Sequence, residues 1–159
     1  MAFQYGSRST ERLDTVHPAL RGVCIKGLSI SPIDITVLEG VRSKSRQEFL
    51  YSKGRTTAEL LAKGIVDVDG RPADKKVTWT LNSKHIPRSD GWSWAVDLAP
   101  YPINWGDTDR FDQMASVMFR AASILGVSIR WGADWDGDGI LREKGETDSP
   151  HFELINPTG

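Results

Sequence analysis

The stretch Ser83-Lys-His-Ile-Pro-Arg-Ser-Asp-Gly-Trp-Ser-Trp-Ala-Val-Asp97 decides how this chain is interpreted. It belongs with a second stretch near the end, Asp148-Ser-Pro-His-Phe-Glu-Leu154. Together they hold two of the three histidines, His85 and His151, and an aspartate, Asp97, inside an apolar run. Two imidazoles and one carboxylate suit a catalytic zinc whose fourth position stays open to water. This hypothesis requires the strands that carry Asp97 and His151 to be neighbours.

Length and composition bound the class of protein. A chain of 159 residues predicts a single domain over residues 1–159. The net charge of −1 gives no argument for binding nucleic acid or a membrane surface. No apolar run approaches the length of a membrane span, and the N-terminus lacks the apolar segment of a secretory signal. The single cysteine, Cys24, excludes an internal disulfide and a Cys-rich metal site.

Charge is unevenly distributed along the chain. Residues 1–90 carry 15 Lys and Arg against 10 Asp and Glu, whereas residues 91–159 carry 5 against 11. An acidic second half suits cation binding, although solvated acidic loops also produce such a bias.

Periodicity and turn signals predict an α+β domain, with a small, mostly antiparallel sheet, packed helices and the zinc site at the sheet. Strands are predicted over residues 35–38, 77–81, 94–99, 127–131 and 151–155, with Pro100 closing the third of them. Helices are predicted over residues 17–28, 44–53, 57–63 and 108–125, and Ser9 or Thr10 is expected to cap a short helix before them. Residues 65–76 are predicted to be an exposed hairpin or loop, and residues 132–150 an acidic, Gly-rich loop.

Three patterns follow one another along the chain: Ser-x-His, then Gly-x-x-x-Ala-Val-Asp, then Asp-x-x-His-Phe-Glu-Leu. In this order they resemble the zinc D-Ala-D-Ala carboxypeptidase superfamily, and more closely the bacteriophage L-alanyl-D-glutamate endopeptidases, which are endolysins. The resemblance covers about residues 7–155. Supporting stretches are Val16-His-Pro-x-Leu20, Thr36-Val-Leu-Glu-Gly-Val-Arg42, Gln47, Gly54-Arg55 and Arg130-Trp-Gly-x-Asp-Trp135.

The spacing within the core motif departs from the family pattern. The family core is Ser-x-His-x-x-Gly-x-Ala-x-Asp, whereas here Asp97 follows His85 by twelve residues and Pro87–Gly91 looks inserted. Asp90 is therefore a rival ligand by spacing alone. We prefer Asp97, because its Ala-Val-Asp strand context matches the family and because Asp90 is expected to sit in a turn. A carboxylate inside an apolar strand is also costly unless it is paired or coordinated.

The resemblance implies a role for each site residue. His85, Asp97 and His151 would bind zinc. Asp148 would be the general base that moves the proton of the attacking water to the leaving amine, with capping of the turn before Pro150 as its alternative. Arg42 would point at the substrate and stabilise the developing oxyanion, unless it is simply a solvated residue.

Other polar residues near these motifs have two interpretations each. Ser83 would hydrogen-bond the substrate or a neighbour of a zinc ligand, or else cap its local turn. Glu153 would orient a zinc ligand or point to solvent. His17, at a helix start, is expected to be structural.

The stretch Asp134-Trp-Asp-Gly-Asp-Gly139 matches the opening of a calcium loop, with acidic residues at alternate positions and Gly at the sixth. The twelfth position is Gly145, so the full EF-hand signature fails, although Glu143 and Glu146 are near. Some endolysins of this type carry a regulatory Ca²⁺ loop here, and an exposed turn is the alternative. The candidate Ca²⁺ ligands are Asp134, Asp136 and Asp138.

The function implied by the resemblance is that of a phage endolysin. It would be a zinc metallopeptidase that hydrolyses the L-Ala–D-Glu bond of peptidoglycan stem peptides. We expect a monomer that does not bind nucleic acid or insert stably into a membrane, and no residues remain for a separate cell-wall-binding domain. It would wait in the host bacterial cytoplasm until a phage membrane pore releases it to the periplasm and cell wall.

Three other functions compete with this one. Superfamily enzymes that cut D-Ala-D-Ala, as carboxypeptidases or dipeptidases, commonly carry Glu and Trp around the second histidine, where this chain has Asp148 and Phe152. A non-catalytic zinc-binding module is the second, because the Hedgehog signalling domain resembles this superfamily. A phage structural or wall-docking protein with an inactive site is the third. The presence of Asp148 and Arg42 argues against the second, the non-catalytic module.

Overall fold

The structure is a computed structural model that describes residues 3–155. The helices are α1 (Ser7–Leu13), α2 (Pro18–Ile30), α3 (Lys44–Ser52), α4 (Thr57–Ala62) and α5 (Thr108–Leu125). The strands are β1 (Asp34–Glu39), β2 (Ala95–Tyr101), β3 (Ile129–Gly132) and β4 (Asp148–Leu154). They form one antiparallel sheet in the order β1-β2-β4-β3, which confirms the predicted α+β class. Residues 1–2 and 156–159 of the expected single domain lie outside the described residues.

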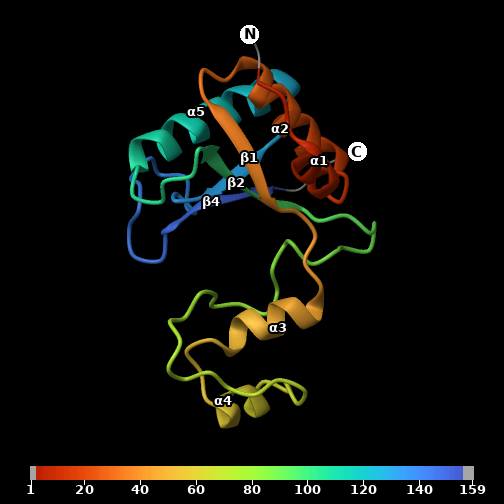
Figure 1. Cartoon of the computed structure of the whole chain (residues 1–159), viewed down its shortest axis with the longest axis vertical. Helices are drawn as coiled ribbons and strands as arrows, with labels where there is room; N and C mark the ends of the chain where they lie inside the picture. Colours follow the sequence, from red (N-terminus) through yellow and green to blue (C-terminus); the bar gives the residue numbers. More distant parts are fainter. Residues whose placement is uncertain (1–2, 156–159) are drawn as a thin grey trace.

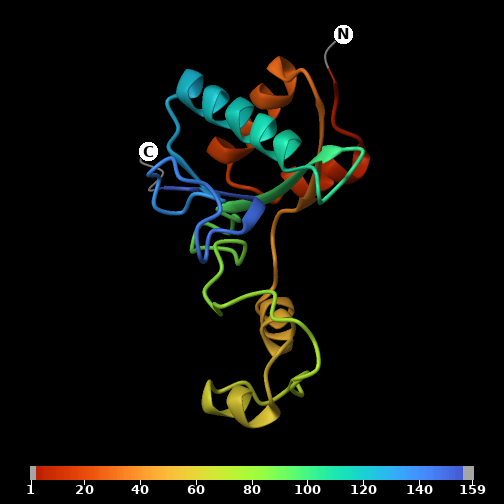
Figure 2. The same ribbon diagram turned by 90° about the vertical axis from the view of Figure 1, so that its left-hand side faces the viewer.

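The main core lies between the sheet and the pair of helices α2 and α5 (Figures 1 and 2). Helix α5 follows from its sequence, because the Asp107 side chain accepts a hydrogen bond from the Arg110 N–H and Gly126 ends the helix at a φ of 69°. Its apolar stripe faces α2 and the sheet. The fully buried core side chains include Leu20, Val23, Val96, Leu98, Met114, Met118 and Phe152. Among residues 3–155, none of the helices has the length and apolar character needed to span a bilayer.

A small lobe, defined as residues 43–82, projects away from the sheet and contains α3 and α4 (Figure 1). Its own apolar cluster is formed by Tyr51, Leu60 and Ile65. Ser43 caps α3 as predicted, by accepting a hydrogen bond from the Arg46 N–H. Thr56 and Glu59 form a reciprocal capping box at the start of α4. Residues 65–76 form a loop rather than a hairpin of two strands, and it is mostly exposed apart from the buried Ile65.

Two details of the predicted strands are wrong. Residues 77–81 belong to no strand, because a glutamine of α3 engages this segment in place of a neighbouring strand: the Gln47 amide donates to the Thr80 carbonyl at 2.6 Å. Strand β2 does not stop at Pro100 but continues to Tyr101. Proline is tolerated there because β4 pairs with β2 only over Ala95–Asp97, so the missing N–H interrupts no ladder on that side.

The predicted cap of the first helix is also wrong. Helix α1 begins at Ser7 after Gly6, with no side-chain cap. Ser9 is buried inside the helix instead, and its hydroxyl accepts a hydrogen bond from the Val37 N–H at 3.0 Å. Ser9 and Thr10 both lie inside α1 rather than before it, so neither is its N-cap.

Candidate metal and active site

The sheet register brings three functional side chains into a row. Asp97 of β2 pairs with Glu39 of β1 on one side and with His151 of β4 on the other. Directly paired residues of antiparallel strands project to the same face, so the three side chains lie side by side across the sheet. The distance from His151 Nδ1 to Asp97 Oδ1 is 3.4 Å. The strands that carry Asp97 and His151 are therefore neighbours, as the zinc hypothesis requires.

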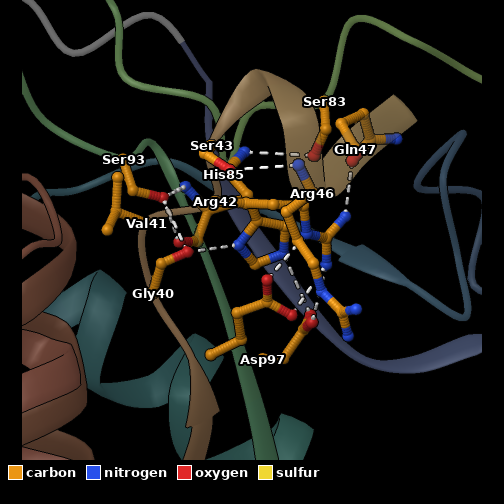
Figure 3. Close-up of polar contacts among 12 residues, drawn as sticks. Gly40, Val41, Arg42, Ser43, Arg46, Gln47, Ser83, His85, Ser93 and Asp97 are labelled. Carbon is orange, nitrogen blue, oxygen red and sulfur yellow. Dashed lines mark hydrogen bonds and ion pairs between the residues drawn. The ribbon is translucent and has the colours of Figure 1, made fainter. Parts of the chain in front are cut away.

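His85 joins this row from the segment that follows the small lobe. Its ring is 1% exposed, its Nε2 lies 3.3 Å from Asp97 Oδ1, and its centroid lies 5.0 Å from that of His151. The ring is fixed by a 2.7 Å hydrogen bond between Nδ1 and the Gly40 carbonyl (Figure 3). Gly40 must be glycine for this contact, because a Cβ there would overlap the Arg12 carbonyl.

The three side chains fit a divalent cation. His85 Nε2 and Asp97 Oδ1 are buried and have no hydrogen-bond partner among the described residues, a costly state unless something else satisfies them. Ligand atoms from His85, Asp97 and His151 all lie within 4.8 Å of one another. In each histidine, the ring nitrogen that does not face the proposed cation is hydrogen-bonded, as is usual for metal-binding histidines. Nδ1 of His85 bonds to the Gly40 carbonyl, and Nε2 of His151 bonds to Glu153 Oε1 at 2.9 Å.

Electrostatics within the triad favour a positive charge at its centre. Burial alone would raise the pKa of Asp97, but the His85 and His151 imidazoles hold it well below its usual range. Burial likewise opposes a charge on His151, yet the nearby carboxylates of Asp97 and Glu153 raise its pKa to about 9. In the metal-free protein His151 therefore carries a proton at neutral pH, and a bound cation would replace that proton.

The Glu153 side chain points to the His151 ring, which it can orient, and not to solvent. It is 6% exposed, and besides His151 it contacts Lys84, whose Nζ lies 2.7 Å from Glu153 Oε2. Despite its burial, His151 and Lys84 lower the pKa of Glu153 to about 2. The carboxylate therefore stays charged and holds the His151 ring by its Nε2–H.

Arg42 lies beside the triad, held by several acceptors (Figure 3). Its Nε and one terminal nitrogen donate to the two carboxylate oxygens of Glu39 at 2.7 and 2.9 Å. The other terminal nitrogen, Nη1, donates to Gln47 Oε1 at 2.8 Å. Asp97 Oδ2 lies 3.7 Å from Nη2, the terminal nitrogen that is bonded to Glu39. Burial works against the charge, but Glu39 outweighs it and the pKa of Arg42 is raised. A guanidinium has more N–H groups than these bonds use, so donors remain for a ligand.

Asp148 stands at the edge of the same cluster. Its Oδ2 lies 3.8 Å from His151 Nδ1, and its side chain is 55% exposed. Partial burial and the nearby Asp97 carboxylate both raise the pKa of Asp148. A carboxylate with a raised pKa and open access to water is suited to accept a proton and give it back.

A cavity of about 700 Å³ connects these groups. The sheet side contributes His85, Asp97, Asp148 and His151, and the facing wall comes from the small lobe. The predicted substrate residue Ser83 also lines the cavity, while its hydroxyl accepts a hydrogen bond from the His85 N–H at 3.2 Å. Ser83 thus makes the local turn contact that was its alternative role.

Two other candidates lie outside the triad. Asp90 caps its own turn: its carboxylate accepts hydrogen bonds from the Trp92 N–H at 2.9 Å and from Trp94 Nε1 at 3.0 Å. Its geometry supports the preference for Asp97. His17 is the N-cap of α2 and accepts a hydrogen bond from the Ala19 N–H at 3.1 Å, in keeping with a structural role.

Two supports of the site lie in stretches that carry the family resemblance, but the sequence assigns neither of them a role. Gly40 acts through its carbonyl, which carries no side-chain signal. Gln47 is 1% exposed and connects Arg42 to Thr78 and Thr80 of the small lobe. It follows Arg42 by five residues just inside a capped helix, and that proximity was the signal that could have identified it.

The acidic loop brings together the three predicted aspartates and one residue that was not predicted. Carboxylate oxygens of Asp134, Asp136, Asp138 and Glu146 lie within 4.8 Å of one another. Asp134 Oδ1 and Glu146 Oε1 are buried without a hydrogen-bond partner in the described part of the chain. The twelfth position of the calcium-loop pattern, which is normally a glutamate ligand, is Gly145 here, and Glu146 supplies a carboxylate to the cluster from the next position. Trp135 connects the two clusters, because its ring lies 5.1 Å from that of His151.

Glu143, the other acidic residue near this loop, does not belong to the four-residue cluster. A side-chain contact with Asp138 raises the pKa of Glu143 to about 7. The crowding of carboxylates around it is the kind of repulsion that a bound cation relieves.

Comparisons with known proteins point in one direction. A family model described as phage L-alanyl-D-glutamate peptidase matches residues 1–155. The L-alanyl-D-glutamate peptidase of Escherichia phage T5 is 29% identical over 161 residues, which cover 98% of this chain and 100% of that protein. The crystal structure of the Serratia marcescens L-Ala D-Glu endopeptidase ChiX matches with a TM-score of 0.62 and 28% identity, covering 96% of this chain and 90% of that chain.

Proposed function

Because the chain belongs to the phage L-alanyl-D-glutamate peptidase family, we propose that it hydrolyses the L-Ala–D-Glu bond of peptidoglycan stem peptides with a zinc ion held by His85, Asp97 and His151. The observation that carries the proposal is the pair of buried, unpartnered ligand atoms, His85 Nε2 and Asp97 Oδ1, in a cavity that Asp148 and Arg42 also line.

The donor set supports zinc. Two neutral imidazoles and one carboxylate are a common ligand set for catalytic zinc, and they leave a position open for water. When bound, the metal would lower the pKa of that water to about 7 and polarise the scissile carbonyl. Gly40 and Glu153 fix the tautomers, so that His85 offers Nε2 and His151 offers Nδ1.

The protein's own groups would move the proton and stabilise charge. Asp148, beside His151 and open to solvent, would accept the proton of the attacking water and deliver it to the leaving amine of D-Glu. Arg42 would donate its remaining N–H groups to the oxyanion that develops on the L-Ala carbonyl. Glu39 and Gln47 hold the guanidinium for that task, so it needs little reorganisation during the reaction.

Digestion of purified peptidoglycan, followed by mass analysis of the soluble fragments, tests this function. The expected products are peptides with a new amino terminus on D-Glu. Release of free D-Ala would assign the site to D-Ala-D-Ala cleavage instead. The absence of any product from zinc-loaded protein would refute the enzymatic proposal and favour a non-catalytic module.

We also propose a Ca²⁺ site formed by Asp134, Asp136, Asp138 and Glu146. The support is the same as for zinc: two buried oxygens without hydrogen-bond partners in a cluster of carboxylates. Because Trp135 lies between two of these residues and packs against His151, Ca²⁺ would order one side of the active-site cavity.

Titration calorimetry with CaCl₂ alone tests the Ca²⁺ site. Glu146→Gln is expected to weaken binding at least tenfold, whereas the matched variant Glu143→Gln should change it little. Equal affinity in wild type and Glu146→Gln would exclude Glu146 from the site. Activity measured with and without CaCl₂ would then show whether the cation controls turnover.

The remaining proposals concern the setting of the enzyme. We propose that it forms a single catalytic domain, acts as a monomer, and stays in the host cytoplasm until a phage membrane pore releases it to the cell wall. The support is the phage origin of the family and the near-complete mutual coverage with the phage T5 peptidase. Sedimentation of the purified protein tests the monomer, and a lysis assay with and without a co-expressed pore protein tests the route.

A further inference from the structure

The cavity wall formed by the small lobe carries two cations that the proposed mechanism does not use. Arg46 comes from the first turn of α3, and Lys76 comes from the loop after α4. Both side chains are exposed. Each lies near an aromatic ring: Arg46 Cζ is 5.6 Å from the Phe49 ring centroid, and Lys76 Nζ is 4.9 Å from that of Trp79.

These two cations are unbalanced within the cavity. Its other cationic residues are paired, Arg42 with Glu39 at 2.7 Å and Lys84 with Glu153 at 2.7 Å. In contrast, neither Arg46 nor Lys76 has a carboxylate oxygen within 4.0 Å among residues 3–155. The small-lobe wall therefore presents uncompensated positive charge to whatever occupies the cavity.

The substrate of the proposed function supplies a matching negative charge. The glutamate on the leaving side gives its amine to the scissile bond and one carboxyl to the rest of the peptide, so its other carboxyl remains a free carboxylate. We propose that Arg46, assisted by Lys76, binds this free carboxylate and thereby selects an acidic residue after the cleaved bond; this inference rests on the proposed function. A guanidinium suits the task because it can bind a carboxylate with two parallel N–H bonds.

The wall is tied to the catalytic groups by Gln47. This residue follows Arg46 in α3, donates to Thr78 Oγ1 and the Thr80 carbonyl, and accepts a hydrogen bond from Arg42. The segment after Lys76 and the helix that carries Arg46 are thereby fixed to each other and to the oxyanion donor. A carboxylate held by this wall would have a set position relative to the scissile bond, as leaving-group selection requires.

Two synthetic stem peptides test the inference, differing only in whether the free carboxyl of D-Glu is a carboxylate or a carboxamide. Wild type is expected to cleave the carboxylate peptide with a kcat/KM at least about tenfold higher, because charge-assisted hydrogen bonds are lost with the amide. The Arg46→Gln/Lys76→Gln double variant should cleave both peptides at about the rate that wild type shows for the carboxamide. The matched control is Lys75→Gln, an exposed cation of the same lobe outside the cavity, and it should keep the preference.

Several results would overturn the assignment. The first is a wild type that shows no preference for the carboxylate peptide. The second is a double variant that keeps the preference. The third is a double variant whose kcat/KM falls by the same factor on both peptides. Failure of the proposed function differs from all of these, because wild type would then cleave neither peptide. Both replaced side chains are exposed and the Ser43 cap uses only the backbone of Arg46, so circular dichroism and zinc content should match wild type.

Discussion

Gln47→Ala isolates the contribution of a side chain that never touches the metal triad. The substitution removes the 2.8 Å bond that Arg42 donates to Gln47 Oε1, while Glu39 keeps its two bonds to the same guanidinium. A hydrogen bond to a charged group contributes roughly 1.5–3 kcal/mol. If that energy holds Arg42 in place for the transition state, kcat/KM should fall by about 10- to 100-fold. Loss of an oxyanion donor itself costs about 100- to 1,000-fold, so Arg42→Ala should be the more damaging variant.

Gln47 also supports the wall of the small lobe, and a second variant separates the two roles. Gln47→Glu keeps an acceptor for Arg42 but loses the amide that donates to Thr78 and Thr80. It should retain kcat and change mainly KM, whereas Gln47→Ala should lower kcat. Digestion of a soluble stem peptide gives both constants, and Gln113→Ala, an exposed glutamine on α5, is the control.

The role of Gln47 in holding Arg42 is refuted if Gln47→Ala folds, retains zinc and turns over like wild type, because the buried bond to Arg42 would then have no part in catalysis. A variant that loses zinc together with activity would also refute it. In that case the side chain would support the whole site rather than the guanidinium.

Four further results are expected. Asp148→Asn should keep zinc and lose at least about 100-fold in kcat, measured by digestion alongside metal analysis, and unchanged turnover would remove it from the mechanism. His85→Ala should lose both zinc and activity, and a variant that still binds zinc at wild-type affinity would exclude His85 as a ligand. Because the pKa of His151 is raised to about 9 without metal, zinc must displace a proton, so its affinity should rise about tenfold per pH unit below pH 9. The same raised pKa means that protonated His151 stabilises the folded protein when zinc has been removed with a chelator. This stability should be lost as the pH rises from about 6.5 to 9, whereas the zinc-loaded protein should not show the loss. Melting curves that change equally with pH in the two forms would contradict the role of His151 as a zinc ligand.

The main helices and most of the strands could be located along the chain because their signals are local. Asp107 and Gly126 bound α5 by capping chemistry that depends on a few neighbouring residues. Residues 77–81 have the composition of a strand, but a strand needs a partner, and the small lobe offers only the side chain of Gln47. Pro100 failed as a stop signal because the extent of β4 decides whether its missing N–H matters.

In the candidate site too, local features could be predicted and features that depend on tertiary structure could not. Side chains of distinctive chemistry, His85, Asp97 and His151, could be selected from the sequence, and pairing of β2 with β4 then places two of them together. Glu146 could be noted only as lying near the calcium-loop pattern, because it comes one position after the twelfth; its place in the acidic cluster depends on how the loop folds. The Gly40 carbonyl was missed because its role depends on tertiary approach, which no residue type encodes.

The position of β4 inside the sheet ties the candidate site to the opening of the whole sheet. This strand carries Asp148 and His151, and it pairs with β2 on one side and with β3 on the other. An edge strand can fray alone, whereas detachment of β4 would break two ladders and leave an unpaired edge on each neighbour. The two side chains should therefore keep their positions until the sheet itself comes apart.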